Sequence, residues 1–516
     1  MTASAETRSM QERYLRKILK ANVYDVAQKT PLDYANILSS RLGNHIFMKR
    51  EDLQQVFSFK LRGAYNKMAQ LGTEERQAGV IAASAGNHAQ GVALSAHRFG
   101  ISATIVMPET TPVIKVNSVE ARGAEVVLYG DTYDEAASHA VELANKSGKT
   151  LVHPYDDPDV IAGQGTIAME ILQQADNDID AIFVPVGGGG LIAGISVYIK
   201  QLYPQIRIIG VEPQDAPCMY EALKQGERVI LDQVGIFADG VAVRQAGKET
   251  FKVAQCCVDE VILVTTDEIC AAIKDIYDDT RSIVEPAGAL AIAGIKKYVK
   301  NTDIKEQQLI AVNSGANINF DRLRHVAERA EIGEQREVLL GVTIPERPGS
   351  FRQFCQLIGH RSITEFNYRY ASEHKAHVFV GIESSAGAGA KQTIIEALEA
   401  NDYAVVDLTD NEMAKLHVRY MVGGHGYGLE NEVLYRFEFP ERPGALFQFL
   451  ERIGENWNIS LFHYRNHGSA YGRILAGLQV PVQDRDNFSN FLQDLGYSYC
   501  KEQDNPAYQL FLGSSQ

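Results

Sequence analysis

Lys60 is the first residue along the chain whose sequence neighbours favour a catalytic role. It stands in the run Ser58-Phe59-Lys60-Leu61-Arg62-Gly63-Ala64, which follows an apolar segment at Ile46–Met48 and opens a predicted helix. A lysine held against the end of a strand is partly desolvated, which lowers its pKa and suits its amine to Schiff-base chemistry. Because an isolated lysine is usually a solvated surface residue, this interpretation depends on supporting residues elsewhere in the chain.

A second polar run follows the predicted strand that ends at Ala83. It consists of hydroxyl, amide and imidazole side chains with two small residues between them: Ser84, Ala85, Gly86, Asn87 and His88. The run opens another predicted helix, whose free N–H groups suit a small carboxylate. His88 alone is more typical of a capping or packing residue than of a catalyst.

Four consecutive glycines, Gly187–Gly190, lie inside the uncharged run 181–199. A membrane helix is excluded because Pro185 and the glycines would break it. The run instead predicts a buried strand over Ala181–Val186, a glycine loop, and a helix from Leu191 to Tyr198. Free N–H groups and the helix dipole make such a loop a cradle for phosphate.

The same loop is open to a second interpretation. Gly188, Gly190 and Ala193 satisfy the G-x-G-x-x-G/A pattern of dinucleotide-binding folds, and Glu212 ends the next predicted strand 24 residues after Gly188. An NAD(P)-dependent oxidoreductase therefore remains an alternative to a single-phosphate cofactor.

These three runs share a context of short apolar strands that alternate with helical segments. Such alternation predicts an α/β fold with a doubly wound, mostly parallel sheet, in which ligands bind at the carboxyl ends of the strands. The predicted strands are Gly79–Ser84, Ala103–Met107, Glu125–Tyr129, Ala181–Val186, Arg207–Val211, Val261–Val264 and Gln308–Asn313.

The C-terminal part contains a tandem repeat. Pro345–Gly349 recurs as Pro440–Gly444, 95 residues later, and Ile363–Arg369 aligns with Ile459–Arg465. Each copy predicts strand, helix, two strands, helix and strand, which is the ferredoxin-like α+β arrangement. The expected organisation is a catalytic domain over 1–330, a linker at 331–336, and two small units at 337–415 and 432–514.

Composition narrows the function classes. The 516 residues carry 50 Lys and Arg against 65 Asp and Glu, a net charge of −15, which argues against a nucleic-acid or anionic-membrane surface. The six cysteines form no C-x-x-C pair, so neither a metal site nor a disulfide framework is expected. No secretory signal is visible at the N-terminus, and a cytoplasmic location is expected.

The runs S-F-K-x-R-G-A, S-A-G-N-H-A-Q-G and G-G-G-G-L, in this order, resemble those of the fold-type-II pyridoxal-phosphate enzymes. The tandem repeat narrows the resemblance to biosynthetic threonine dehydratases, with two ACT-like regulatory units, and it extends from about Tyr14 to Leu512. The resemblance implies α,β-elimination of L-threonine to 2-oxobutanoate and ammonia, the first step of isoleucine biosynthesis, with L-serine as a further substrate.

The resemblance also implies roles for individual residues. Lys60 would hold pyridoxal 5'-phosphate as a Schiff base, Asn87 would contact its ring hydroxyl, and Ser314 its ring nitrogen. Glu285 would lie near the ring or merely cap a helix. The remaining cofactor contacts would be Phe59, Gly187, Gly188, Gly189, Gly190 and Leu191, and the substrate contacts Ser84, Ala85, Gly86, Asn87 and His88.

In the ACT-like units, the resemblance implies inhibition by isoleucine, opposed by valine, and a homotetrameric assembly. The candidate effector residues are Gly349, Phe351, Tyr368, Gly444, Leu446 and Tyr464. Two further alternatives are a serine dehydratase or racemase of the same fold, and a non-catalytic amino-acid sensor. The tandem repeat argues against the first and the intact Lys60 run against the second.

Overall fold

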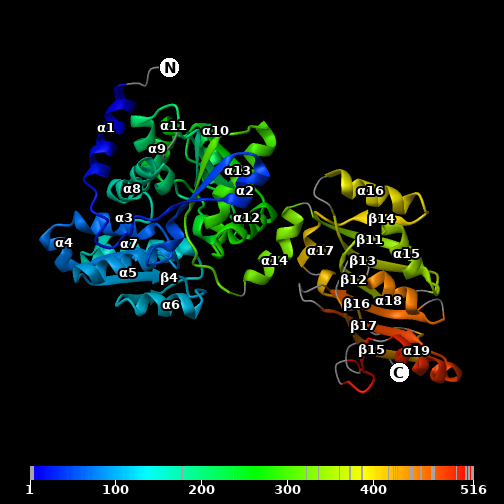
Figure 1. The fold of residues 1–516 in the computed structure, drawn as a ribbon. Helices are drawn as coiled ribbons and strands as arrows, with labels where there is room; N and C mark the ends of the chain where they lie inside the picture. Colours follow the sequence, from blue (N-terminus) through cyan, green and yellow to red (C-terminus); the bar gives the residue numbers. More distant parts are fainter. Residues whose placement is uncertain are drawn as a thin grey trace. The chain divides into compact units, whose positions relative to one another are not determined.

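The structure, a computed structural model, divides into two compact units, Met1–Gly333 and Glu334–Gln516 (Figure 1). The division falls within the segment 331–336, where the sequence predicts a linker. The described residues are 5–175, 178–235, 237–320, 322–334, 336–359, 361–370, 373–384, 388–416, 418–421, 423–424, 426, 428–440, 445–453, 456–465, 471–495, 497–505, 508 and 512.

The first unit contains a six-stranded sheet that is parallel except for β1 at one edge. Its strands, in spatial order, are β1 (Leu32–Tyr34), β2 (His45–Arg50), β10 (Gln308–Asn313), β7 (Ala181–Pro185), β8 (Arg207–Pro213) and β9 (Glu260–Val264). Strands β7 and β10 are buried along their whole length. This agrees with the continuous apolar runs expected of parallel strands that are covered on both faces.

A separate four-stranded parallel sheet holds the remaining strands of this unit. Its spatial order is β5 (Glu125–Leu128), β4 (Ala103–Met107), β3 (Val80–Ala83) and β6 (Thr150–Leu151). The prediction of a mostly parallel α/β fold is confirmed. The strands are nevertheless shared between two sheets, a division that strand–helix alternation does not reveal.

Helices precede, connect and follow these strands (Figure 1). They are α1 (Ala5–Leu19), α2 (Asn36–Leu42), α3 (Lys60–Ala69), α4 (Thr73–Ala78), α5 (Asn87–Phe99), α6 (Val113–Glu120), α7 (Tyr133–Ser147), α8 (Pro158–Gln174), α9 (Gly190–Leu202), α10 (Cys218–Gln225), α11 (Lys248–Cys257), α12 (Thr266–Thr280), α13 (Pro286–Thr302) and α14 (Arg322–Gly333), with short 3-10 turns at Glu51–Leu53 and Asp239–Val241.

Side chains of β7 alternate between two hydrophobic clusters. Ile182 and Val184 pack in a cluster with residues of α8 and α9, whereas Ala181 and Phe183 pack in a cluster with residues of α12 and α13. The strand is therefore covered by helices on both faces, as predicted from its unbroken apolar sequence. Among the described residues, no helix combines the length and apolar character that a membrane crossing requires. The run 181–199 is strand, loop and helix.

The second unit is built on one eight-stranded sheet in which every described pairing is antiparallel. The first copy consists of β11 (Glu337–Pro345), α15 (Ser350–Ile358), β12 (Ile363–Arg369), β13 (Lys375–Glu383), α16 (Ala388–Glu399) and β14 (Ala404–Asp407). The second consists of β15 (Glu432–Pro440), α18 (Ala445–Ile453), β16 (Asn458–Arg465), β17 (Tyr471–Gln479), α19 (Arg485–Leu495) and β18 (Ser498–Lys501). Between the copies lie α17 (Glu412–Leu416) and a 3-10 turn, Val418–Tyr420. The predicted strand and helix order of both copies is confirmed.

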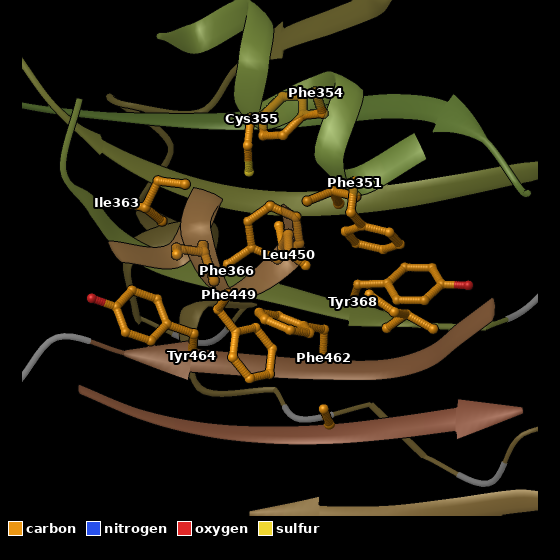
Figure 2. Close-up of a cluster of buried hydrophobic side chains, with 14 of the residues drawn as sticks. Phe351, Phe354, Cys355, Ile363, Phe366, Tyr368, Phe449, Leu450, Phe462 and Tyr464 are labelled. Atoms are coloured by element: carbon orange, nitrogen blue, oxygen red, sulfur yellow. The ribbon is translucent and has the colours of Figure 1, made fainter. Parts of the chain in front are cut away.

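The two copies are joined at their second strands, because β12 pairs with β16 in the middle of the sheet. They also share one hydrophobic core. Phe366 of the first copy and Phe462 of the second lie 5.3 Å apart between ring centroids, and Phe351 packs on both Phe366 and Tyr368 (Figure 2). The tandem repeat thus forms a single unit with a continuous core.

Candidate active site

Lys60 is the first residue of α3, and its side chain is partly buried. Its Nζ donates a hydrogen bond to the Pro154 carbonyl oxygen at 3.2 Å. Burial lowers the pKa of the Lys60 amine from 10.5 to about 8, although the Glu285 carboxylate acts in the opposite direction. An amine with this pKa is partly neutral near pH 8, so it is available as a nucleophile or a base.

The backbone beside Lys60 is joined to the loop that follows β10. The Phe59 N–H donates to the Ser314 carbonyl oxygen at 3.2 Å, and the Ala316 N–H donates to the Phe57 carbonyl oxygen at 2.8 Å. Strands β2 and β10 are neighbours in the sheet, so both segments emerge from the same edge. The structure therefore brings together two of the predicted cofactor-binding segments.

The side chains of Phe59 and Ser314 complete this part of the site. The Phe59 ring is buried, and its centroid lies 5.3 Å from the Lys60 Nζ. The Ser314 hydroxyl is also buried and donates to the Ala287 carbonyl oxygen at 3.3 Å. Ser314 therefore offers an uncharged hydroxyl group, which can take part in a hydrogen bond between neutral groups.

Asn87, the first residue of α5, is held by two neighbours. Its Nδ2 donates to Glu285 Oε1 at 2.7 Å, and its Oδ1 accepts from Asn317 Nδ2 at 2.6 Å. Asn317 also donates its backbone N–H to Glu285 Oε2 at 3.1 Å. These hydrogen bonds distinguish the oxygen of the Asn87 amide from its nitrogen. One N–H of Nδ2 is left for a ligand.

Glu285 lies in this site. It precedes α13, yet its side chain makes no capping hydrogen bond to that helix. Burial raises the pKa of the Glu285 carboxyl to about 7, and Asp239 adds to the increase, whereas the hydrogen bonds from Asn87 and Asn317 oppose it. Of the two alternatives that the sequence leaves open for Glu285, a helix cap and a position near the ring, the cap is absent, and the carboxylate instead contacts Asn87.

The turn before α5 is partly buried and turns back on itself: the Gly86 N–H donates to the Ser84 hydroxyl at 3.2 Å. Ala85 lies between them, also partly buried. The His88 ring is turned toward β6, and its Nε2 donates to the Val152 carbonyl oxygen at 2.8 Å. Burial and the charge of Lys60 lower the pKa of His88 to about 3, so this imidazole is neutral and packs inside the fold.

Gly187–Gly190 connect β7 to α9, and Leu191 follows as a buried residue. None of the five backbone N–H groups from Gly187 to Leu191 donates to a partner among the described residues. The glycines are required by space: a Cβ at Gly188 would lie 2.3 Å from the Tyr155 ring. Gly189 has a φ of +95°, a conformation that favours glycine. The result is a loop of free donors at a helix N-terminus.

Glu212, on which the dinucleotide interpretation depends, instead makes structural hydrogen bonds. It is fully buried at the end of β8, and its carboxylate accepts the backbone N–H groups of Met219 at 2.9 Å and Tyr220 at 2.8 Å. It therefore caps the start of α10, and both of its oxygens accept hydrogen bonds there, whereas a ribose-binding residue would use them for the ligand. Within the described ranges, no group of three or more His, Cys, Asp or Glu side chains could hold a metal ion.

The described candidate effector residues lie in a cleft and in the core beside it, and the two groups meet where the ring of Phe351 packs on that of Tyr368. Gly349 and Phe351 line a surface cleft together with residues of the second copy: Leu450, Ile453, Trp457, Asn458 and Ile459. Tyr368, Leu446 and Tyr464 belong to the shared hydrophobic core, where Figure 2 shows the rings of Tyr368 and Tyr464. Gly444 lies outside the described residues.

Sequence reasoning missed Tyr155, Asn317 and Trp457. Asn317 lies only three residues after Ser314, a predicted cofactor contact. This short spacing could have indicated that Asn317 also belongs to the site. Tyr155 carries no such signal because its own strand and loop are remote from the glycine loop in sequence. Trp457, the single tryptophan of the chain, lies where the second copy carries its one-residue insertion.

These groups fit a cofactor that joins an aldehyde to a phosphate. The amine of Lys60 has a lowered pKa, as an aldehyde-binding lysine requires. The glycine loop offers unpaired N–H groups at a helix N-terminus, as a phosphate requires, and leaves no room for side chains there. Between them, Asn87 and Ser314 offer neutral hydrogen-bonding groups for a heteroaromatic ring.

Comparison with known proteins agrees with this chemistry. Residues 23–315 match the family described as "Pyridoxal-phosphate dependent enzyme", and residues 328–418 and 423–512 each match "C-terminal regulatory domain of Threonine dehydratase". The biosynthetic L-threonine dehydratase IlvA of Pasteurella multocida is 56% identical over 97% of this chain and 97% of that protein. That of Escherichia coli is 55% identical over the same shares.

A solved structure agrees as well. The processed form of threonine deaminase isoform 2 from Solanum lycopersicum is 52% identical, with a TM-score of 0.62, and the match covers 64% of this chain and 94% of that one. The chain thus belongs to the biosynthetic threonine dehydratases, pyridoxal-phosphate-dependent enzymes that carry two C-terminal regulatory domains.

Proposed function

We propose that this chain deaminates L-threonine to 2-oxobutanoate and ammonia, the first step of isoleucine biosynthesis, with Lys60 at the reacting centre. The observation that carries the proposal is the junction of the Lys60 segment with the Ser314 loop, beside the fully oriented Asn87 amide. These are the groups that the family's chemistry needs at the carboxyl edge of the sheet. Sequence identity of about 55% across the whole chain to threonine dehydratases supports the choice of substrate.

Each group would hold one part of the cofactor. The Lys60 amine would bind its aldehyde carbon, the N–H groups of Gly187–Leu191 its phosphate, the free N–H of Asn87 its ring hydroxyl, and Ser314 its ring nitrogen. Phe59, next to Lys60, would pack against it. When bound, pyridoxal phosphate supplies an electron sink that stabilises negative charge at the substrate Cα.

The protein decides which bond breaks. Lys60, whose pKa is about 8, removes the α-proton as general base in its neutral form. The Ser314 hydroxyl is too weak an acid to donate a full proton to a ring nitrogen, so charge stays near Cα and the β-hydroxyl is expelled. The α-proton taken up by Lys60 and the expelled hydroxyl together make up one molecule of water. Hydrolysis of the released enamine consumes one water and yields 2-oxobutanoate and ammonia.

The start of α5 would orient the substrate. Its first turn follows Ser84–Gly86 and receives no side-chain cap from a described residue, so its N–H groups suit the threonine carboxylate. His88 stays neutral and would support this turn from within. Because one methyl group in a pocket changes the free energy of binding by only ~1–3 kcal/mol, L-serine should react as well.

Substitution of the lysine tests this proposal. In Lys60→Ala, the visible absorbance of the bound cofactor should disappear, and turnover of threonine should fall by about 1,000-fold or more. Lys146→Ala on the exposed face of α7 is a matched control that should keep both. A Lys60→Ala enzyme with normal turnover would refute the assignment.

For regulation, we propose that isoleucine inhibits the enzyme by binding the cleft lined by Gly349 and Phe351, and that valine opposes it. Trp457 supports this choice: its side chain is buried, it lines the cleft, and its Nε1 has no hydrogen-bond partner among the described residues. An unpaired buried donor beside Arg347 suits a carboxylate, and the walls from Leu450 and Ile459 suit a branched aliphatic side chain.

The indole nitrogen provides the test. Trp457→Phe keeps an aromatic ring but removes the donor, so the isoleucine concentration for half-inhibition should rise about 3- to 10-fold, with threonine turnover unchanged. Tyr499→Phe, on the exposed strand β18, is the control and should keep normal inhibition. Unaltered inhibition of Trp457→Phe would move the effector site elsewhere.

We also propose a homotetramer that works in the cytoplasm. All six cysteines are free thiols, as is usual for proteins of a reducing compartment. The assembly follows from the family resemblance, and light scattering coupled to size-exclusion chromatography would measure it directly.

A further inference from the structure

The orientation of the glycine loop depends on α11, a helix that lies far from the loop in the sequence. The Gly188 carbonyl oxygen accepts two hydrogen bonds from the start of α11: from Thr250 Oγ1 at 2.6 Å and from the Gly247 N–H at 3.1 Å. Thr250 is fully buried. The Gly188 carbonyl is therefore held on the side of the loop that faces α11.

The orientation of the Gly188 carbonyl also determines the orientation of the Gly189 N–H donor. In a trans peptide, the carbonyl and the following N–H point in opposite directions, so a Gly188 oxygen turned toward α11 turns the Gly189 N–H the other way. The chain contains no cis peptide bond among its described residues. If the peptide rotated, the carbonyl oxygen would enter the loop and repel an anion there.

Asp156 holds the start of α11 in turn. Its carboxylate accepts three backbone N–H groups: those of Lys248 and Glu249 at 2.8 Å each, and that of Thr250 at 3.3 Å. The Asp156 N–H donates to His153 Nδ1 at 2.8 Å, which anchors the residue to its own segment. The negative charge of Asp156 thus interacts with the N-terminus of α11.

The segment that carries Asp156 reaches both ends of the site. Pro154 accepts the hydrogen bond from Lys60, and the ring of Tyr155 covers Gly188 so closely that no side chain would fit there. One short segment therefore contacts the reactive amine, the glycine loop and the helix that orients the loop.

We propose that Asp156 and Thr250 are positioning residues for the phosphate group of the cofactor. Asp156 fixes the first turn of α11, and Thr250 uses that turn to hold the Gly188 peptide with its N–H groups directed into the loop. The inference rests on the proposed role of Gly187–Leu191 as the phosphate site, and it adds two residues that do not touch the phosphate themselves.

The test compares two ligands of the apoenzyme, pyridoxal 5'-phosphate and pyridoxal, which lacks the phosphate. Their dissociation constants follow from the visible absorbance of the bound aldehyde. Thr250→Val keeps the shape of the side chain and removes the hydroxyl donor. We expect pyridoxal phosphate to bind about 10-fold more weakly to this variant, with the affinity for pyridoxal unchanged within about twofold.

Two further variants separate positioning from simple folding defects. Thr250→Ser retains the hydroxyl and should bind pyridoxal phosphate as the unmodified protein does. Asp156→Asn loses one acceptor oxygen and should weaken binding of pyridoxal phosphate about fivefold. If Asp156 acted only by repelling the phosphate, removal of its charge would tighten binding instead, which would overturn the proposal.

Asp157→Asn is the matched control. This neighbour caps α8 by accepting the N–H groups of Asp159 and Val160, and it should leave the ratio of the two affinities unchanged. Equal weakening of both ligands in Thr250→Val would overturn the proposal. If the unmodified protein bound pyridoxal as tightly as pyridoxal phosphate, the phosphate site itself would be refuted, which is a distinguishable result.

Discussion

Two buried polar regions of the catalytic unit differ in whether their hydrogen bonds are complete. The first surrounds Arg62, two residues after Lys60: the side chains of Arg62, Lys49, Glu51 and Glu170 are all fully buried. Arg62 donates to both carboxylates at 2.6–3.0 Å, and Lys49 donates to Glu170 at 2.6 Å. Two positive and two negative charges balance.

The second region is the loop Gly187–Leu191, which contains no charged side chain and whose N–H groups have no partner among the described residues. Removing charges from water is costly, so the Arg62 cluster is sustained only because each member is paired. The unpaired donors of the loop are those that we assign to the phosphate in the proposed function. The comparison therefore sets a closed cluster, which fixes geometry, against an open loop, to which we assign ligand binding.

The largest effect should come from opening the closed cluster. In Arg62→Met, Glu51 and Glu170 lose the guanidinium between them, and the free energy of unfolding of the apoprotein should fall by about 3–5 kcal/mol. Urea denaturation measures it. Arg98→Met on the exposed side of α5 should change the stability by less than ~0.5 kcal/mol. A loss below ~1 kcal/mol in Arg62→Met would show that the cluster does not depend on pairing.

Glu285 differs from both regions: it is a buried carboxyl that accepts hydrogen bonds from Asn87 and Asn317 and forms no ion pair with a described cation. Its pKa is raised from 4.5 to about 7, so the folded protein keeps a proton there that the unfolded chain releases. Its contribution to stability is therefore complete below pH 4.5 and is lost as the pH rises to about 7. This corresponds to roughly 3 kcal/mol.

Glu285→Gln removes this titration. The stability of the variant relative to the unmodified apoprotein should increase between pH 4.5 and pH 7 and stay constant above it, as urea denaturation at several pH values would reveal. Glu120→Gln at the exposed end of α6 is the control and should produce a flat difference. A flat difference for Glu285→Gln would contradict the raised pKa.

Filling the open loop should have a smaller effect on folding. In Gly188→Ala, the new methyl group would lie 2.3 Å from the Tyr155 ring, and the resulting overpacking should cost about 1–3 kcal/mol. Removal of the ring in Tyr155→Ala makes room for the methyl group. In a double-mutant cycle, the two changes should therefore be non-additive by about 1 kcal/mol or more. Additive costs would mean that the ring does not enforce the glycine.

Much of the site could be predicted because its residues stand at strand–helix junctions. Lys60, Gly187–Gly190 and Ser314 follow strands of the six-stranded sheet, whose carboxyl ends meet at one edge, and Asn87 follows β3 of the other sheet. Such local patterns do not record the order of strands. For that reason the sequence could not indicate that β3 and β10 belong to different sheets.

The supporting residues could not be predicted for a related reason. Thr250 and Asp156 act through contacts between loops and helix ends that lie far apart in the chain, and neither stands in a recognisable motif. In the regulatory unit, the repeat predicts the elements of each copy correctly. It does not indicate that Trp457 of one copy faces Gly349 of the other, because a repeat describes each copy alone.

The smallest effect concerns strain beside the closed cluster. Phe57 has a φ of +55°, although its ring is 52% exposed, so the backbone and not the ring keeps it there. Its carbonyl accepts the Ala316 N–H at 2.8 Å, one of the two backbone bonds described above that join the Lys60 segment to the Ser314 loop. This left-handed conformation costs a residue other than glycine about 1 kcal/mol.

Phe57→Gly and Phe57→Ala both remove the ring, but only glycine relieves the strain. Phe57→Gly should therefore be more stable than Phe57→Ala by about 1 kcal/mol in thermal unfolding of the apoprotein. If alanine were the more stable of the two, the segment would adopt another conformation without its hydrogen bond to Ala316. The strain would then not be part of the geometry that holds Lys60, and the closed region alone would have to account for its position.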